Sequence, residues 1–216
     1  KITNDSLTDK KIYEQAGKIL REGGLVAFPT ETVYGLGADA LDEEASAKIY
    51  AAKGRPSDNP LIVHIADIEA LYKLSCEVPD KALKLADKFW PGPLTMILKK
   101  SDIVPDSITG GLGTVAIRMP SHKVAAELIR TSGVYIAAPS ANTSGKPSPT
   151  RASHVIKDLS GKIDMIIEDD TVDIGVESTI IDLSEEVPTI LRPGYITKEM
   201  FEEVIGGGRI DPAITE

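Results

Sequence analysis

The stretch KGRPSDNPLIVHI, residues 53–65, gathers two cations, an asparagine and a histidine around a backbone stiffened by prolines. Lys53 and Arg55 lie two residues apart and precede Pro56, so both side chains could reach one anion from one loop. Arginine pairs with phosphate or carboxylate through two hydrogen bonds, and lysine acts as a point charge. The stretch therefore predicts contact with an anionic ligand.

Polar groups also follow or interrupt several apolar segments elsewhere in the chain. The polar segment TETVYG follows LVAFP, and SANTSGKPSP follows VYIAAP. The apolar segment TVAIRMP contains Arg118, and ESTIIDL at residues 177–183 begins with the polar residues EST. The segment TILRPG ends in Arg192, Pro193 and Gly194. Ligands of open α/β sheets bind in the crevice at the strand ends, so we expect one crevice built from many loops. Its predicted cations and short polar side chains are Lys53, Arg55, Arg118, Lys146, Arg192, Ser140, Asn142, Thr143, Ser144 and Ser148.

This set fits an anionic, phosphorylated ligand better than any member does alone. A single cation or serine from the set is equally consistent with a solvated loop. His64, taken alone within LIVHI, is more typical of a strand histidine satisfied by the core than of a ligand contact.

The elements that must position these residues alternate along the chain. Apolar residues at helical spacing predict a first helix over residues 8–24, with Thr8 as N-cap and Gly23 as the stop, and a helix over 121–133 capped by Ser121. Further helices are expected over 43–53, 67–74, 80–89 and 197–208. Strands are expected over 25–29, 61–65, 94–100, 114–120, 134–139, 165–170, 178–183 and 189–194.

Helices interleaved with short strands predict an α/β fold, a sheet with helices on both faces. We expect one domain over residues 1–205. The glycines at 206–208 and the Asp211-Pro212 pair indicate the start of a linker or tail over 206–216.

Composition excludes several classes of protein. The net charge of -9 argues against a broad basic surface for nucleic acid, although a local basic pocket remains open. The single cysteine, Cys76, cannot form an internal disulfide, which favours a cytoplasmic location, and we expect it to be partly buried and not a nucleophile. No apolar run approaches the roughly 20 residues that span a bilayer.

Common catalytic motifs are absent from the sequence. There is no P-loop, no G-x-G-x-x-G and no G-x-S-x-G. His64, His122 and His154 lack ligand spacing, so no protein metal site is predicted, and we expect His122 and His154 on helix surfaces.

Seven motifs, in order along nearly the whole chain, resemble the YrdC-like family of threonylcarbamoyl-AMP synthases. Residues 175–179, Gly-Val-Glu-Ser-Thr, look more like the longer members, which carry a second C-terminal domain, and we expect this chain to stop before that domain. The motifs are FPTETVYGLGADA, KGRPSDNPLIVHI, FWPGPLTMIL, VAIRMP, APSANTSGKPSPT, ESTIIDL and ILRPG.

The resemblance implies an α/β domain with a twisted mixed sheet around a large central cavity. It also implies a reaction, in which L-threonine, bicarbonate and ATP give threonylcarbamoyl-AMP and pyrophosphate for threonylcarbamoyladenosine in tRNA. By the same resemblance, catalysis falls to Lys53, Arg55, Ser140 and Asn142, and ATP binding to Arg55, Asn59, Thr114, Ser140, Ser148 and Arg192. Threonine binding falls to Thr32, His64, Arg118, Ala138 and Ser178.

Magnesium is expected with ATP, held mainly by phosphate oxygens and water, because no carboxylate cage is evident. The expected partner downstream is the tRNA threonylcarbamoyl transferase. One alternative is a carbamoyltransferase-type domain like those inside hydrogenase-maturation enzymes, but this chain lacks their zinc-finger cysteines. Another is a non-catalytic RNA-binding module, against which the acidic charge counts, while weak RNA binding stays open.

Overall fold

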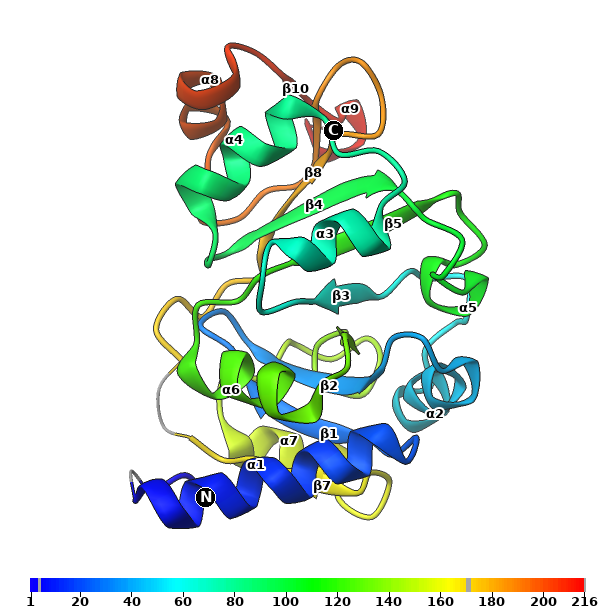
Figure 1. Cartoon of the computed structure of the whole chain (residues 1–216), viewed down its shortest axis with the longest axis vertical. Coiled ribbons are helices and arrows are strands. Elements are labelled where there is room, and N and C mark those ends of the chain that lie inside the picture. Colours follow the sequence, from blue (N-terminus) through cyan, green and yellow to red (C-terminus); the bar gives the residue numbers. More distant parts are fainter. Residues whose placement is uncertain (4, 170–171, 216) are drawn as a thin grey trace.

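The eight predicted strands and two that were not predicted, β2 and β10, pair into one mixed sheet in the order β10-β9-β8-β4-β5-β3-β6-β2-β1-β7 (Figure 1). The computed structural model describes residues 1–3, 5–169 and 172–215. Parallel pairs such as β3–β5 and β4–β8 alternate with antiparallel pairs such as β4–β5. The strands are β1 (Val26–Pro29), β2 (Tyr34–Asp39), β3 (Ile62–His64), β4 (Leu94–Lys99), β5 (Thr114–Arg118), β6 (Ile136–Ala137), β7 (Met165–Ile166), β8 (Thr179–Asp182), β9 (Thr189–Arg192) and β10 (Arg209–Ile210).

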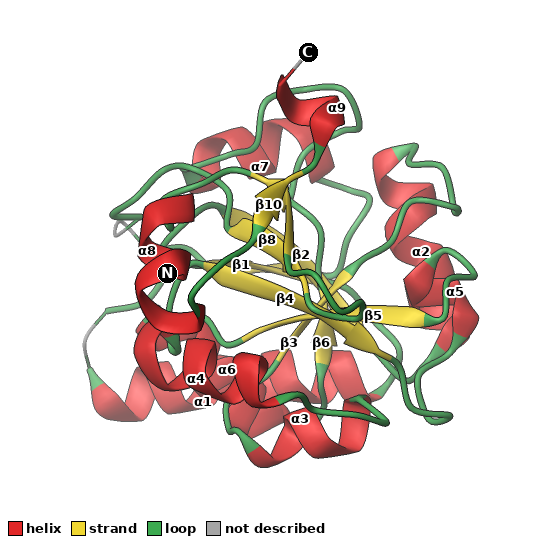
Figure 2. Ribbon diagram, turned by 90° about the horizontal axis from the view of Figure 1, so that it is seen from above, coloured by secondary structure: helices red, strands yellow, loops and turns green. Residues whose placement is uncertain are grey.

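The helices of the described residues lie on both sides of this sheet, as predicted. Helices α3, α4 and α6 lie in front of the sheet in Figure 1, and α7 lies behind it, as the view from above in Figure 2 confirms. The helices are α1 (Ser6–Arg21), α2 (Glu43–Lys53), α3 (Glu69–Leu74), α4 (Asp80–Phe89), α5 (Asp106–Thr109), α6 (Lys123–Ser132), α7 (Ala152–Leu159), α8 (Lys198–Ile205) and α9 (Pro212–Thr215).

Strand alternation gives the central sheet two different faces. Val63 of β3 and Ile117 of β5 are fully buried and belong to one apolar cluster with Leu71 of α3 and Leu85 of α4. Their neighbours along the same strands point to the opposite face because successive side chains in a strand alternate. That opposite face carries His64 and Arg118, paired in register across β3 and β5.

Two predicted helix caps are wrong by a few residues. Helix α1 begins earlier than expected, since the carboxylate of Asp5, not Thr8, is the N-cap and accepts a hydrogen bond from the Thr8 backbone. Helix α6 is capped by the ring of His122 instead of Ser121. His122 is accordingly buried, not on the surface as expected.

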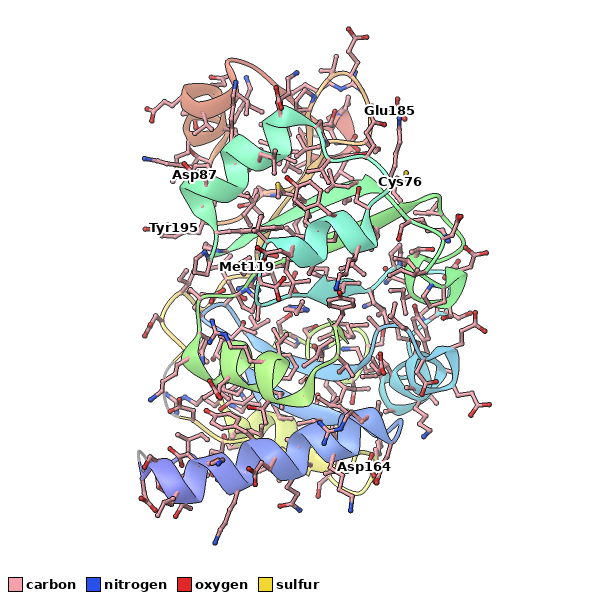
Figure 3. All side chains as sticks on the ribbon, in the orientation of Figure 1. Cys76, Asp87, Met119, Asp164, Glu185 and Tyr195 are labelled. Carbon is pink, nitrogen blue, oxygen red and sulfur yellow. The ribbon has the colours of Figure 1, made fainter. Side chains whose placement is uncertain are left out.

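Three further outcomes concern isolated residues and segments. Cys76 is exposed, contrary to the prediction, and Figure 3 shows it at the edge of the molecule near Glu185. The predicted strand over 165–170 is confirmed only at β7, and its last residue, 170, lies outside the described residues. Within the part of the chain that the structure describes, no helix has the length and apolar character to cross a membrane.

The segment after Gly206 contributes to the sheet. Its strand β10 pairs in parallel with β9 through Arg209 and Ile210, opposite Thr189 and Ile190. The division of the chain into a catalytic domain up to residue 205 and a tail beyond it stays a prediction.

Candidate active site

A cavity of about 260 Å³ opens on the sheet face that carries His64 and Arg118. Residues from six strands line it, together with residues from the loops that follow β1 and β6. These segments are far apart in the sequence. Most of the predicted site residues line it, namely Thr32, Arg55, Asn59, His64, Arg118, Ala138, Ser140, Ser178 and Arg192. The expected crevice built from many loops is therefore present.

The remaining predicted residues lie outside the cavity lining. Ser148 borders it, because its hydroxyl donates a hydrogen bond of 2.7 Å to Glu177, a lining residue. Thr114 opens β5 on the same face as Arg118, four residues away, and pairs with Lys99. Lys146 does not line the cavity, and its ammonium group forms an exposed ion pair of 2.9 Å with the carboxylate of Asp158.

One wall of the cavity centres on the guanidinium group of Arg192. Its Nη1 donates to the carboxylate of Glu177 at 2.8 Å, and its Nε donates to the backbone oxygen of Ser178 at 2.9 Å. Its Nη2 donates to the Ser178 hydroxyl at 3.1 Å, and that hydroxyl also bonds Thr95 at 2.7 Å. The network fixes a cation beside two hydroxyl groups at the cavity wall.

A second part of the cavity wall centres on Arg118, whose side chain is 5% exposed. Its Nη1 donates to the Thr32 hydroxyl at 2.8 Å, its Nε donates to the Gly92 oxygen at 3.4 Å, and its Nη2 forms an ion pair with Glu31. An arginine has five N–H donors, so two remain for the paired contact that a ligand carboxylate makes.

Glu31 is a buried residue that the sequence analysis did not single out. Besides the ion pair with Arg118, its Oε2 accepts hydrogen bonds from the backbone nitrogens of Ser121 and His122, at the start of α6. A carboxylate at a helix N-terminus also interacts favourably with the helix dipole. Glu31 thus fixes both the orientation of Arg118 and the position of α6.

His64 is buried, with its Nδ1 between two backbone carbonyl oxygens, those of Ile62 at 3.0 Å and Ile136 at 3.3 Å. Both neighbours are acceptors, so Nδ1 carries the proton and Nε2 is left as an acceptor. Burial lowers the pKa of His64 to about 4. The cavity therefore contains a neutral imidazole, which can accept a hydrogen bond from a hydroxyl or ammonium group.

This burial predicts a pH-dependent stability. Between pH 6.5 and about 4 the unfolded chain binds more protons at His64 than the folded chain, so the free energy of unfolding falls as pH falls, by up to about 3 kcal/mol. Urea unfolding at several pH values in this window measures the effect. His64→Gln removes the titrating group and should flatten the profile, and parallel profiles for the two proteins would contradict the assignment.

Lys53 ends α2 and is buried beneath the cavity, not exposed on its wall. Its Nζ donates to the backbone oxygen of Ser140, and its own backbone oxygen accepts from the nitrogen of Ser144. The Asn142 side chain donates to the Thr143 and Lys146 oxygens, which leaves its buried Oδ1 without a partner. These residues hold the 140–146 loop in shape, and the Asn142 oxygen is free to accept a further hydrogen bond.

The expectation that Lys53 and Arg55 both reach one anion directly is not met in this structure. After Gly54, in the left-handed conformation at φ 63°, the chain turns, so that Arg55 lines the cavity while Lys53 lies against the Ser140 loop. The terminal nitrogen of Arg55 donates to the Pro60 oxygen at 3.0 Å, and its Nε is buried without a partner.

Burial, and to a smaller extent mutual repulsion, lowers the pKa values of the cations around the cavity. Burial, and then the charge of Arg55, lowers the pKa of Lys53 to about 8. Burial also lowers the pKa of Arg55, Arg118 and Arg192, and the charge of Arg192 contributes to the shift at Arg118 and Arg55. Such shifts cluster where a folded chain holds charge for function. An anionic ligand would relieve this repulsion.

A magnesium ion that accompanies a nucleotide fits this donor set in one way only. Among the described residues no group of three or more His, Cys, Asp or Glu side chains could hold a metal, and Glu177 is the one described carboxylate that lines the cavity. Mg²⁺ commonly binds through one or two carboxylates together with substrate phosphates and retained water. Glu177 suits that arrangement, with the phosphates as the main ligands.

The fold and cavity define an α/β domain with three arginines, Arg55, Arg118 and Arg192, in the lining of one cavity. The model of the Sua5/YciO/YrdC family, described as "Telomere recombination", matches residues 18–194. The chain belongs to this family.

Curated relatives carry the name threonylcarbamoyl-AMP synthase. The protein from Pyrococcus abyssi is 59% identical over 210 residues, which is 97% of this chain and 62% of the relative. The protein from Bacillus subtilis is 54% identical over 216 residues, 100% of this chain and 62% of the relative. The chain thus spans less than two thirds of the length of these relatives.

Solved structures confirm the fold. P. abyssi Sua5 complexed with L-threonine matches with a TM-score of 0.92 at 59% identity, over 94% of this chain and 60% of that chain. E. coli YciO matches with a TM-score of 0.79 at 25% identity, over 89% and 93% of the two chains. Full-length HypF matches with a TM-score of 0.73 at 21% identity, over 83% of this chain and 28% of that chain, which shows the fold alone.

Proposed function

We propose that this chain is the catalytic part of a threonylcarbamoyl-AMP synthase, a nucleotidyltransferase. It joins L-threonine, bicarbonate and ATP, and releases threonylcarbamoyl-AMP, pyrophosphate and water. The observation that carries the proposal is the cavity itself, which brings together residues predicted separately for ATP and for threonine. The names of the P. abyssi and B. subtilis relatives, and the threonine bound to the P. abyssi protein, support it.

The groups around Arg118 and around Arg192 in the cavity lining suggest how the ligands divide. Arg118, Thr32 and neutral His64 present two free guanidinium donors, a hydroxyl and an imidazole acceptor, which match the carboxylate, hydroxyl and amine of threonine. Arg55 and Arg192 lie on the side of the cavity that Ser148 borders and suit the phosphates.

The chemistry then needs positioning more than covalent help. Threonine and bicarbonate condense to a carbamate with loss of water, and a carbamate oxygen attacks the α-phosphorus of ATP. The bond from that phosphorus to the bridging oxygen breaks, and pyrophosphate leaves. Two anions must approach each other, so fixed cations such as Arg55 and Arg192 contribute by neutralising charge in place. Magnesium, when bound to the phosphates, supplies further neutralisation.

The remaining assignments follow from this activity. The product would serve tRNA modification in the cytoplasm, passed on to a tRNA threonylcarbamoyl transferase. Release of pyrophosphate that depends on both threonine and bicarbonate tests the proposal. Turnover indifferent to threonine would favour a carbamoyltransferase-type domain, and salt-dependent RNA affinity without turnover would favour an RNA-binding module.

A further inference from the structure

The only described carboxylate that lines the cavity, Glu177, lies among cations and donors predicted for the nucleotide. Its Oε1 accepts from the Ser148 hydroxyl at 2.7 Å, and its Oε2 accepts from Arg192 at 2.8 Å. In the sequence, Glu177 stands out only as part of the EST group. A negative charge is unexpected at this place, because a polyphosphate bound beside Arg192 would be repelled by it.

The position of Glu177 is set by the backbone and is not that of a loose surface side chain. Gly194 follows β9 and passes so close that a Cβ atom there would lie 2.7 Å from the Glu177 backbone oxygen and 2.7 Å from the Thr179 nitrogen. Only glycine permits this approach. The glycine that ends the ILRPG motif therefore fixes the backbone of Glu177 at the cavity wall, and the Glu177 side chain is 36% exposed.

The charge of Glu177 acts on several cations of the site. Burial lowers the pKa of Lys53, Arg55 and Arg192, and the Glu177 carboxylate opposes that shift at each of the three. In the protein without a bound ligand, the negative charge of Glu177 thus balances part of the positive charge of these cations. In the proposed complex, the phosphate groups of the nucleotide would balance the same positive charge.

We propose that Glu177 makes the cavity selective for the magnesium-bound nucleotide over the free nucleotide, an inference that rests on the proposed use of ATP. A free triphosphate carries its full negative charge and must approach the Glu177 carboxylate without compensation. A triphosphate that carries Mg²⁺ presents a cation and its water molecules, which a carboxylate binds directly or through water. Each carboxylate oxygen of Glu177 retains acceptor capacity beyond its one protein contact.

The test is calorimetric titration of the chain with ATP, once with excess Mg²⁺ and once with a chelator, without threonine or bicarbonate. For the unsubstituted chain the magnesium form should bind at least about fivefold more tightly, in keeping with a partly exposed charge. Glu177→Gln keeps the shape and removes the charge, so free ATP should bind more tightly and the preference should shrink by about fivefold or more.

Two further variants sharpen the result. Glu203→Gln, at an exposed position of α8 that does not line the cavity, changes the net charge equally and should leave the preference unchanged. Glu177→Ala should reproduce the loss of preference even if Glu177→Gln were poorly folded.

The inference would be overturned if Glu177→Gln kept the preference for the magnesium form of ATP. It would also be overturned if Glu177→Gln bound both forms of ATP more weakly by the same factor, because Glu177 would then only order Ser148 and Arg192. Failure of both nucleotide forms to bind the unsubstituted chain would overturn the proposed function as well.

Discussion

Arg55→Ala and Lys53→Ala should each lower the rate of threonylcarbamoyl-AMP formation by about 100-fold or more. Each variant removes a preorganised positive charge, or a side chain that holds the site in shape, where negative charge develops in the reaction. The two variants should act differently. Arg55 lines the cavity, so its loss should also weaken ATP binding. Lys53 holds the Ser140 backbone from beneath, so its loss should reduce turnover with a smaller change in ATP affinity. Steady-state kinetics with ATP titration measures both effects.

A matched control lies on the same helix as Lys53. The ammonium of Lys48 donates to the Gly23 oxygen at 2.7 Å, and Lys48 is absent from the cavity lining. Lys48→Ala should leave turnover nearly unchanged, as exposed substitutions usually alter stability by less than about 0.5 kcal/mol. Near-normal turnover of both Arg55→Ala and Lys53→Ala would mean that neither side chain contributes to catalysis.

Arg118→Ala should raise the threonine dissociation constant by at least about 100-fold and change ATP affinity by less than about threefold. The reason is the loss of two charge-assisted hydrogen bonds to the threonine carboxylate, each worth about 1.5–3 kcal/mol. Calorimetric titration of each ligand separates the two effects. A variant that lost ATP and kept threonine would show that the division of the cavity into an amino-acid wall and a nucleotide wall is wrong.

The Glu31–Arg118 ion pair decides how that experiment must be controlled. Both side chains are about 5% exposed, so Arg118→Ala leaves a buried carboxylate without its partner, which costs about 3–5 kcal/mol of stability. The double variant Glu31→Gln, Arg118→Ala removes both charges and should recover much of that stability without recovering threonine affinity. Arg118→Lys keeps the charge but loses the paired geometry, and should bind threonine weakly.

Local signals in the sequence were sufficient for most elements and for much of the site. Helix α2 has the predicted bounds, Glu43–Lys53, because Asp42 caps it and Gly54 stops it in the left-handed conformation. Most cavity residues could be gathered in advance because they lie within or next to short apolar strands, and strand ends converge in an α/β sheet.

What the sequence did not reveal depends on contacts between distant segments. Strand β2 was not predicted, and its glycines have low strand propensity. A Cβ at Gly37 would lie 2.6 Å from Ile136 and 2.8 Å from Phe28, so the glycine is required by close packing between neighbouring strands. Glu31 bonds the start of α6 some 90 residues away, and no local pattern marks that partner.

The most direct test of the account is incubation of the chain with ATP, bicarbonate and labelled threonine, followed by separation of the products. The account predicts labelled threonylcarbamoyl-AMP together with an equal amount of pyrophosphate, both absent when threonine or bicarbonate is omitted and both strongly reduced in Arg55→Ala. Hydrolysis of ATP at the same rate without threonine, with no labelled adenylate formed, would contradict it.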